Sequence, residues 1–352
     1  MIPAIETPKA LGYRMPAEWE EHRATWIAWP HEKADWPRKF APIPWVYGEV
    51  VRHLVAGERV RILVKDGAHR KAAGSLLKRV GVDLGQVDFY QVPTDRVWTR
   101  DYCPLFLKGP RDRAITNWKF NGWAKYANHR NDDAVPDRLV RLLKLAQWKP
   151  ALGKRRIVLE GGSIEVNGRG TLLTTEECLL SPVQARNPGV PREELERVLC
   201  ENLGVRKILW LGDGIVGDDT HGHIDDLARF TDAGTVVVAS EDDPADENHP
   251  RLRENRERLE RMTDQDGKSL RIVPLPMPRA LTLDGQRLPA SYANFYIGNS
   301  AVLVPTFNDR NDRVALKTLA ALFPTREVVG IHAVDLVWGL GTLHCMTQQE
   351  PA

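Results

Sequence analysis

A pattern of two apolar strands joined by a polar or glycine-containing turn recurs along this chain of 352 residues. The copies run over residues 162–175, 223–239 and 294–307, with turn signals at Asn167-Gly168, Asp232-Ala233-Gly234 and Gly298-Asn299. A polar residue suited to chemistry opens each copy, and such residues recur at intervals of roughly 60. They are Asp101, Glu160, His223, Asn294 and Cys345. One hairpin and one helix per interval is typical of a radial repeat, so we expect these residues to share a centre.

Helical segments and short strands are expected between the hairpins. Residues 135–148 and 191–203 show the apolar spacing of helices. The polar segment 240–268 is interpreted as a solvated loop and a surface helix, with Pro250 near its start and Gly267 beyond its end. Short apolar runs that follow helices are predicted strands, namely Val60–Val64, Ile157–Leu159, Ile208–Leu211 and Glu327–Gly330. No Pro/Gly/Ser-rich linker interrupts the chain, so a single α/β domain over residues 1–352 is expected.

Composition excludes several classes of protein. Hydrophobic residues make up 42% of the chain and charged residues 27%, as in ordinary globular proteins. Lys and Arg total 49 against 47 Asp and Glu, which is too balanced to predict binding to nucleic acid or to a membrane surface. No apolar run is long enough to cross a membrane, and the first residues lack the pattern of a signal peptide. The four cysteines form no C-x-x-C pair, so we expect reduced thiols and a cytoplasmic location.

His223 and Asp225 are the first candidate pair. If residues 222–230 form a strand, side chains two apart point to one face, and an imidazole lies beside a carboxylate. That pair suits a general acid/base next to a carboxylate that binds a cation. A competing interpretation is a zinc site on His221, His223 and Asp225, because this H-x-H-x-D spacing resembles that of metallo-β-lactamase-type hydrolases. The other histidines supply no second closely spaced set of ligands, which disfavours zinc.

Cys345 lies beyond Gly339-Leu340-Gly341, where glycines let the backbone approach a ligand. Most free cysteines are small buried hydrophobes. Here, however, polar residues flank the thiol on both sides, including His344 and Thr347, and such neighbours favour a nucleophile.

Several spaced motifs together resemble the agmatine deiminases, a branch of the peptidylarginine-deiminase-type guanidino-modifying enzymes. The resemblance runs from about Met15 to Pro351. Its main segments are Trp98-Thr-Arg-Asp-Tyr-Cys-Pro104, Leu159-Glu-Gly-Gly162, Asp219-Thr-His-Gly-His-Ile-Asp225 and His344-Cys-Met-Thr-Gln-Gln-Glu-Pro351. Further matching segments are Met15–Glu20, Thr25–His31, Trp118–Asn121, Cys178–Leu180 and Arg186–Pro188.

This resemblance implies a five-fold pseudosymmetric α/β propeller of ββαβ-type units around a central pocket. It implies Cys345 as nucleophile and His223 as general acid/base. Asp101 and Asp225 would hold the guanidinium, and Glu160 would bind it or support His223. The implied reaction converts agmatine to N-carbamoylputrescine and ammonia, without metal or other cofactor, and a homodimer is implied as well.

The chemistry of these side chains agrees with those roles. A guanidinium is planar and always charged, and it presents its N–H groups in a fork that two carboxylates can bind. A bound cation or a protonated histidine lowers the pKa of a thiol. Trp98 is a candidate for lining the pocket with an aromatic face, or else a packing residue. Asp219 is a candidate partner for a distal ammonium, although its Gly-Asp-Asp-Thr context is also typical of a polar turn.

Three places depart from the usual family pattern. Cys103 stands where a glycine is common, Gly339-Leu-Gly-Thr342 replaces a glycine-rich stretch, and residues 121–128 differ near Ala124. The substrate therefore remains open among agmatine, free arginine and peptide-terminal arginine. A non-catalytic binding protein is disfavoured, because binding alone requires neither Cys345 nor His223.

Overall fold

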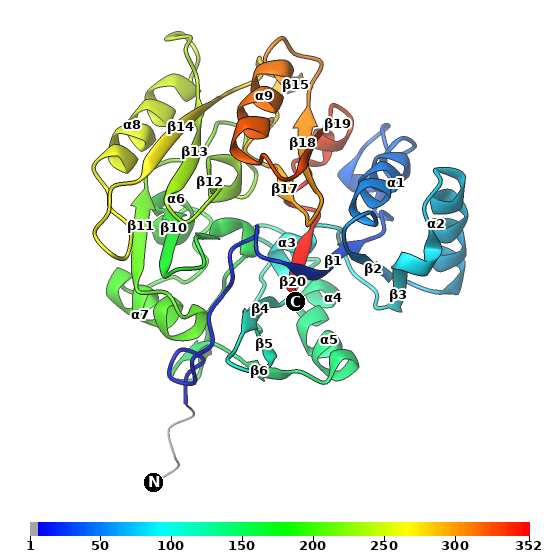
Figure 1. Cartoon of the computed structure of the whole chain (residues 1–352), viewed down its shortest axis with the longest axis horizontal. Coiled ribbons are helices and arrows are strands. Elements are labelled where there is room, and N and C mark those ends of the chain that lie inside the picture. The colour runs from blue at the N-terminus through cyan, green and yellow to red at the C-terminus, as the bar shows by residue number, and fades with distance from the viewer. Residues whose placement is uncertain (1–5) are drawn as a thin grey trace.

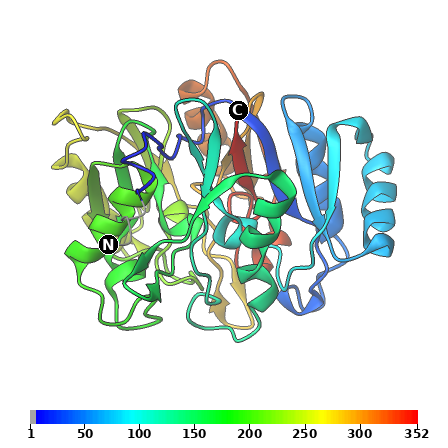
Figure 2. The same ribbon diagram turned by 90° about the horizontal axis from the view of Figure 1, so that it is seen from below.

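The computed structural model describes residues 6–352, so the first five residues of the expected domain lie outside the described part. The fold is mixed α/β, with five sheets of three or four strands and two small two-stranded sheets. Figure 1 shows the larger helices toward the periphery and β1 and β20 near the middle of the view. The molecule turned by 90° is shown in Figure 2, where the C-terminus lies beside the first strand.

The two ends of the chain meet in the four-stranded sheet, whose order is β20-β1-β2-β3. β20 pairs antiparallel with β1, whereas β1, β2 and β3 run parallel. Parallel neighbours require a crossover connection, which α1 and α2 supply. The elements are β1 (His22–Ala28), α1 (Ile43–Leu54), β2 (Arg59–Val64), α2 (Gly67–Arg79), β3 (Val87–Gln91) and β20 (Gln348–Pro351).

The four other large sheets repeat one topology. In each, an antiparallel hairpin is followed by a helix that leads to a third, parallel strand. The hairpins are β4–β5 (Leu105–Lys108, Arg113–Thr116), β9–β10 (Glu165–Val166, Thr171–Thr175), β12–β13 (Ala228–Phe230, Thr235–Ser240) and β17–β18 (Tyr296–Ile297, Ala301–Thr306). The crossover helices are α5 (Val135–Leu143), α7 (Arg192–Leu203), α8 (Asn248–Glu260) and α9 (Asp312–Leu322). The closing strands are β6 (Ala146–Trp148), β11 (Lys207–Leu211), β14 (Arg271–Pro276) and β19 (Glu327–His332).

Short elements complete the fold. They are α3 (Thr99–Tyr102), α4 (Arg130–Asp133), α6 (Glu176–Leu180), the pair β7 (Ala151–Leu152) and β8 (Arg155–Arg156), the pair β15 (Thr282–Leu283) and β16 (Gln286–Arg287), and five 3-10 turns among the described residues. The middle strands are apolar and buried on both faces, as in Val236–Ala239, because helices and neighbouring sheets cover them.

Two predicted elements are wrong in extent. The helix expected over 135–148 ends at Leu143, because Lys144 adopts a left-handed conformation (φ 54°, ψ 42°), and residues 146–148 form β6 instead. The strand expected at 157–159 is an isolated bridge between Lys119 and Val158. The predicted strands at 60–64, 208–211 and 327–330 are confirmed within β2, β11 and β19, and the helix at 191–203 is α7.

The recurring polar residues stand just before the first strand of each sheet rather than on it. Asp101 lies in α3 before β4, Glu160 precedes β9, and His223 precedes β12. Asn294 and Cys345 precede β17 and β20 in the same way. The prediction of a strand over residues 222–230 is wrong, because Ile224–Asp226 form a 3-10 turn and β12 begins at Ala228.

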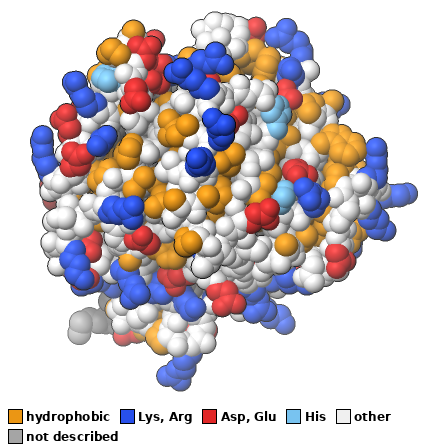
Figure 3. All heavy atoms as spheres, turned by 45° about the horizontal axis from the view of Figure 1, so that its top comes forward, with side chains coloured by type: hydrophobic (Ala, Val, Ile, Leu, Met, Phe, Trp, Pro, Cys, Tyr) orange, Lys and Arg blue, Asp and Glu red, His pale blue; other side chains and the backbone are white. Residues whose placement is uncertain are grey.

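The surface mixes charges of both signs. On the face in Figure 3, lysine and arginine side chains alternate with acidic ones and with scattered apolar groups. Over residues 6–352, no helix is both long and apolar enough to span a bilayer.

Candidate active site

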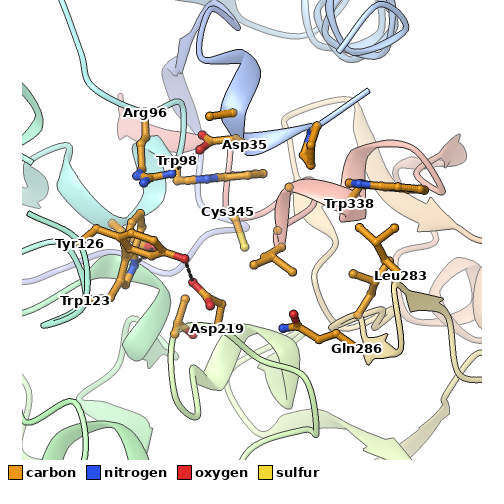
Figure 4. Close-up of a pocket in the computed structure, with 18 of the residues that line it drawn as sticks. Asp35, Arg96, Trp98, Trp123, Tyr126, Asp219, Leu283, Gln286, Trp338 and Cys345 are labelled. Carbon is orange, nitrogen blue, oxygen red and sulfur yellow. Dashed lines mark hydrogen bonds and ion pairs between the residues drawn. The ribbon is translucent and has the colours of Figure 1, made fainter. Parts of the chain in front are cut away.

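Cys345 lies at a cavity of about 470 Å³ formed by loops from several sheets. Figure 4 shows its sulfur directed into the space between Trp98, Asp219 and Trp338. The cavity is lined by Ala34, Asp35, Pro37, Arg96, Trp98, Asp101, Trp123, Tyr126, Asp219, Thr220, Leu283, Asp284, Gln286, Leu288, Trp338, Gly339, Leu340, Gly341 and Cys345.

The Cys345 thiol is almost buried and faces acidic groups. Its Sγ lies 3.8 Å from Asp225 Oδ2 and 3.1 Å from Asn294 Nδ2. Burial raises the pKa of Cys345 well above its usual value, and the negative charges of Asp225, Asp226 and Asp101 raise it further. Without a cation in the cavity, the thiol form is therefore favoured.

His223 stands among three carboxylates. Its Nδ1 lies 3.8 Å from Asp101 Oδ1 and 3.9 Å from Asp225 Oδ1, and its Nε2 lies 3.8 Å from Glu160 Oε2. Burial opposes the charged ring, but the Asp101 charge and the contacts with Cys178 and Glu160 outweigh it. The pKa of His223 is therefore raised well above its usual value. The ring is consequently poised to give a proton.

Gly162 makes this convergence possible. Its N–H donates to Asp101 Oδ1 at 3.0 Å. A Cβ at this position would lie 2.6 Å from His223 Nδ1, 2.8 Å from Asp101 Oδ1 and 3.0 Å from Asp225 Oδ2. The second glycine of the Leu159-Glu-Gly-Gly162 segment thus fills a place where no side chain fits.

Asp101 and Glu160 have opposite titration behaviour. Burial raises the pKa of Asp101 to about 6. The negative charges of Asp225 and Glu160 raise this pKa further, whereas the positive charge of His223 lowers it. Trp123 Nε1 donates to its Oδ2 at 2.8 Å. Burial also works against the Glu160 carboxylate, but Arg186 (Nε to Oε1, 3.1 Å) and His223 lower the pKa of Glu160 to about 2. Glu160 is thus a permanent anion behind His223.

His344 orients Asp225, and sequence reasoning missed this role. His344 Nδ1 lies 2.7 Å from Asp225 Oδ2, and its Nε2 lies 2.7 Å from Glu18 Oε2. Burial opposes both carboxylates, yet their charged neighbours lower the pKa of Asp225 and of Glu18. Both ring nitrogens of His344 thus face carboxylate oxygens, which holds the ring between Asp225 and Glu18. Nothing but its position beside Cys345 marked it in the sequence.

Asp218 and Asp219 have different roles. The Asp218 carboxylate accepts from the backbone N–H groups of Gly222 (2.8 Å) and His223 (2.9 Å), so it builds the turn that presents the imidazole. Asp219 lines the cavity, as expected for a substrate contact. Its carboxylate accepts from Lys125 Nζ at 2.5 Å. It also accepts from Tyr126 Oη at 2.7 Å (Figure 4).

Asp35 is a cavity residue that sequence reasoning missed. One of its oxygens pairs with Arg96 Nη1, whereas its Oδ2 is buried without a hydrogen-bond partner. Burial raises the pKa of Asp35 to about 6, despite Arg96, and Glu32 and Asp219 raise it as well. Asp35 is the last residue of a short 3-10 turn, Lys33–Asp35, and the next residue is a buried tryptophan. No local sequence pattern distinguishes Asp35 from an acidic residue at the surface.

Trp98 lines the cavity, as expected of one candidate role, and also packs. Its ring lies against Gly341, where a Cβ would approach to 2.8 Å, and against Trp36 with a centroid distance of 5.5 Å.

Among the departures from the family pattern, Leu340 lines the cavity from a left-handed conformation with φ 67°. Cys103 is buried outside the lining, and Ala124 also has a positive φ of 55°.

The zinc ligands considered from the sequence do not converge. His221 has a φ of 64°, and its ring contacts Ser181 Oγ at 3.1 Å and Glu177 at 3.7 Å. Among residues 6–352, the group with metal-ligand chemistry is Glu160, Cys178 and His223, whose ligand atoms lie within 4.8 Å of one another. The Arg186 guanidinium already neutralises Glu160 there, so the donor set fits a structural ion pair better than a cation site.

Comparison with known proteins gives a consistent result. The family model described as Porphyromonas-type peptidyl-arginine deiminase matches residues 14–351. The agmatine deiminases of Pseudomonas fluorescens and Pseudomonas aeruginosa are each 34% identical, over 98% of this chain and 97% of theirs. The structure of the agmatine deiminase of Enterococcus faecalis superposes with a TM-score of 0.90 at 32% identity, covering 99% of this chain and 98% of that one.

Cys345 and Asp101 line the cavity, and His223 and Asp225 lie directly behind them. A mixed α/β fold with a cysteine, a histidine and paired carboxylates at one site is typical of the guanidino-modifying enzymes. The chain belongs to the Porphyromonas-type peptidyl-arginine deiminase family, within which its relatives at this level of identity include agmatine deiminases. The resemblance stated from the motifs is confirmed.

Proposed function

We propose that this protein hydrolyses the guanidinium C–N bond of agmatine and releases N-carbamoylputrescine and ammonia. The observation that carries the proposal is the arrangement around the cavity floor. Asp101 and Asp225 both approach one ring nitrogen of His223, at 3.8 and 3.9 Å from its Nδ1, and Cys345 Sγ lies 3.8 Å from Asp225.

Binding comes first in the proposed sequence. The guanidinium donates its N–H groups to Asp101 and Asp225, so the charged group receives two oxygen acceptors in a buried site. The cation also offsets the carboxylate charges that raise the pKa of Cys345. Substrate binding therefore favours the thiolate at the place where it is needed.

Two displacements complete the reaction. The Cys345 thiolate attacks the guanidinium carbon and gives a tetrahedral adduct. His223 protonates one nitrogen, which departs as ammonia, and a planar S-alkylthiouronium remains on the sulfur. His223 then takes a proton from water, whose oxygen attacks the same carbon. The C–S bond breaks as the carbonyl forms, and the remaining O–H proton of the adduct passes to solvent. The ureido product leaves and the thiolate is restored. Water is the only co-reactant, so no metal or other cofactor is needed.

Glu160 supports this cycle without touching the reacting carbon. As a permanent anion 3.8 Å from His223 Nε2, it stabilises the imidazolium that forms when water gives up its proton. Its own charge is fixed by Arg186, so the histidine can lose and regain a proton while Glu160 stays ionised.

The tail of the substrate is proposed to lie toward Asp35 and Asp219. These carboxylates line the cavity beyond the thiol, and the free Oδ2 of Asp35 can accept from an ammonium. Trp98 contributes an aromatic wall. A substrate carboxylate would have to compete for Arg96 and Lys125, which are already held by Asp35 and Asp219. The charge pattern therefore favours agmatine over free arginine or a peptide-terminal arginine.

We also infer the arrangement of the whole molecule. Four sheets share the hairpin–helix–strand topology, and in the fifth β20, β1 and β2 pair in the corresponding antiparallel and parallel order. This pattern supports a single catalytic domain with five-fold pseudosymmetry, in which each unit sends one polar residue to the centre. The unpaired thiols of all four cysteines support a cytoplasmic location. A homodimer follows from the family resemblance, and light scattering on the purified protein tests it.

The deciding experiment measures ureido product and ammonia from chelator-treated protein with agmatine, arginine and a peptidyl-arginine side by side. Fast turnover of agmatine alone supports the reaction, the tail specificity and metal independence together. Turnover of arginine alone would support the proposed reaction at the guanidinium but contradict the proposed binding of a substrate ammonium by Asp35 and Asp219. Activity that appears only when zinc is added would contradict the cysteine mechanism.

The Cys345→Ala variant tests the nucleophile. We expect turnover to fall below detection while the melting temperature stays close to that of the wild type, because the substitution removes a single sulfur atom that borders the cavity. The matched control is Cys200→Ala, a half-buried thiol on α7, which should keep full activity. Substantial activity in the Cys345 variant would remove the covalent route.

A further inference from the structure

We propose that Asn294 is a catalytic residue whose side-chain amide donates a hydrogen bond to the Cys345 sulfur and stabilises its thiolate. Asn294 precedes β17 and is fully buried. Its Nδ2 lies 3.1 Å from Cys345 Sγ, closer than any carboxylate oxygen that contacts the sulfur. The proposal rests on the proposed function only in taking Cys345 as the nucleophile.

The orientation of the amide follows from its partners. Asn294 Oδ1 lies 3.0 Å from the backbone nitrogen of His344 and 3.4 Å from that of Cys345. Thr342 Oγ1 lies 2.7 Å from the same oxygen. Backbone N–H groups only donate, so the atom facing them must be the amide oxygen. The NH₂ group must then face the sulfur.

This arrangement serves both states of the sulfur. A thiol can donate to Asn294 Oδ1, which lies 3.4 Å away, whereas a thiolate accepts from Nδ2. A hydrogen bond to an ionised acceptor is about twice as strong as one between neutral groups, so the amide favours the thiolate. The negative charges of Asp225, Asp226 and Asp101 disfavour the thiolate. The hydrogen bond from the Asn294 amide partly offsets that repulsion.

The same amide fixes the nucleophile in space. Its oxygen gathers the hydroxyl and backbone donors of residues 342–345, so the loop that carries the thiol is tied to the unit that begins at β17. The sulfur is held from one side by Nδ2, which leaves its other side open to the cavity. Asn294 thus contributes both charge stabilisation and direction to the attack.

The test is the pH dependence of Cys345 alkylation by iodoacetamide, followed on the Cys345 peptide by mass spectrometry. This neutral reagent does not depend on the guanidinium site, and peptide resolution separates Cys345 from the other three thiols. In Asn294→Asp, one oxygen keeps the loop donors and the other places an anion against the sulfur. We expect the titration midpoint to rise by about one pH unit or more. Asn294→Ala should raise it by less, because it removes the donor without adding charge.

The matched control is Asn255→Asp. Asn255 is an equally buried asparagine on α8, which accepts from the Gly212 N–H and donates to the Asp213 carbonyl. We expect this variant to lower the melting temperature without moving the Cys345 midpoint. An unchanged midpoint in both Asn294 variants would overturn the proposal, and so would an equal shift in the Asn255 variant.

A measurement on the unsubstituted protein avoids any folding defect of the variants. In protein labelled with ¹⁵N-asparagine, one side-chain NH₂ pair should shift with the same midpoint as alkylation, and this shift should be absent in Cys345→Ala. If no side-chain amide follows the sulfur, the proposal fails. These readouts need no turnover. A shifted midpoint in a protein inactive on agmatine would therefore refute the proposed substrate and keep the role of Asn294.

Discussion

Asp101 links substrate affinity to pH at the residue scale. Its pKa of about 6 lies above that of an ordinary aspartate, so the carboxylate is charged above this pH and neutral below it. As the pH falls through about 6, the guanidinium loses one of its two acceptors. We expect the KM for agmatine to rise roughly tenfold per pH unit below the pKa. Asp35 titrates in the same range, so the measurement is repeated with butylguanidine, which has no ammonium. A KM that stays flat from pH 7 to pH 5 for both compounds would contradict the role of Asp101.

Gly162→Ala tests the close packing of the catalytic groups. The added Cβ would lie within 3.0 Å of His223, Asp101 and Asp225, and it would push them apart. Displacement of catalytic groups by about 1 Å typically costs on the order of 100-fold in rate. We therefore expect kcat/KM to fall by about that factor. Gly189→Ala is a suitable control for one added methyl group in open space, although its positive φ of 75° adds some strain. Equal kinetics in Gly162→Ala and the wild type would show that the site tolerates a side chain there.

The sequence predicted the residues that take part in the reaction better than the residues that position them. Cys345, His223 and Asp101 occur in dense polar segments, which made them visible as candidates. Glu18 and Asp35 act through contacts with residues far away in the chain. Glu18 lies in the family-like segment Met15–Glu20, but nothing there indicates its contacts, and no local pattern marks Asp35. Such partners arise only when separate loops meet.

At the element scale, helix caps supply a local source of stability. The Asp66 carboxylate caps the first turn of α2 by accepting from the His69 N–H at 2.8 Å. We expect Asp66→Ala to lower the free energy of unfolding by about 1 kcal/mol and the melting temperature by a few degrees, with agmatine kinetics unchanged. Asp66→Asn keeps the cap and serves as the control. A loss of activity in either variant would mean that α2 contributes to the site.

The hairpins could be predicted from the sequence, but the ends of some helices and strands could not. The turn signal Asn167-Gly168 specifies a local geometry, and β9 and β10 form around it. By contrast, residues 135–148 carry continuous helical spacing, yet pairing with β5 makes residues 146–148 a strand. The strand predicted through His223 fails for a related reason. The Asp218 carboxylate holds the backbone nitrogen of His223 in a turn, which local propensity does not reveal.

At the scale of the whole molecule, Glu18 joins several sheets at one buried point. Its Oε1 accepts from Arg229 Nη2 at 2.9 Å and from the Ile297 N–H at 2.8 Å. Its Oε2 accepts from Arg100 Nη2 at 3.1 Å and lies 2.7 Å from His344 Nε2. These partners belong to or adjoin different sheets, and His344 in turn orients Asp225. One carboxylate thus couples the global fold to the guanidinium site.

Glu18→Gln should therefore affect stability and activity together. The substitution keeps the shape but removes the anion that the buried guanidinium groups of Arg100 and Arg229 share, and Arg229 keeps only its pair with Glu165. Removing one partner of a buried ion pair typically costs about 3–5 kcal/mol. We expect a clear fall in melting temperature, and a lower kcat at temperatures where the variant is folded, because Asp225 loses its orientation. Glu20→Gln is the matched control, since its carboxylate pairs with Arg14 at the partly exposed surface. Such pairs contribute about 0–1 kcal/mol. If calorimetry gave the two variants equal melting temperatures, the buried contacts of Glu18 would not stabilise the fold more than a surface ion pair does.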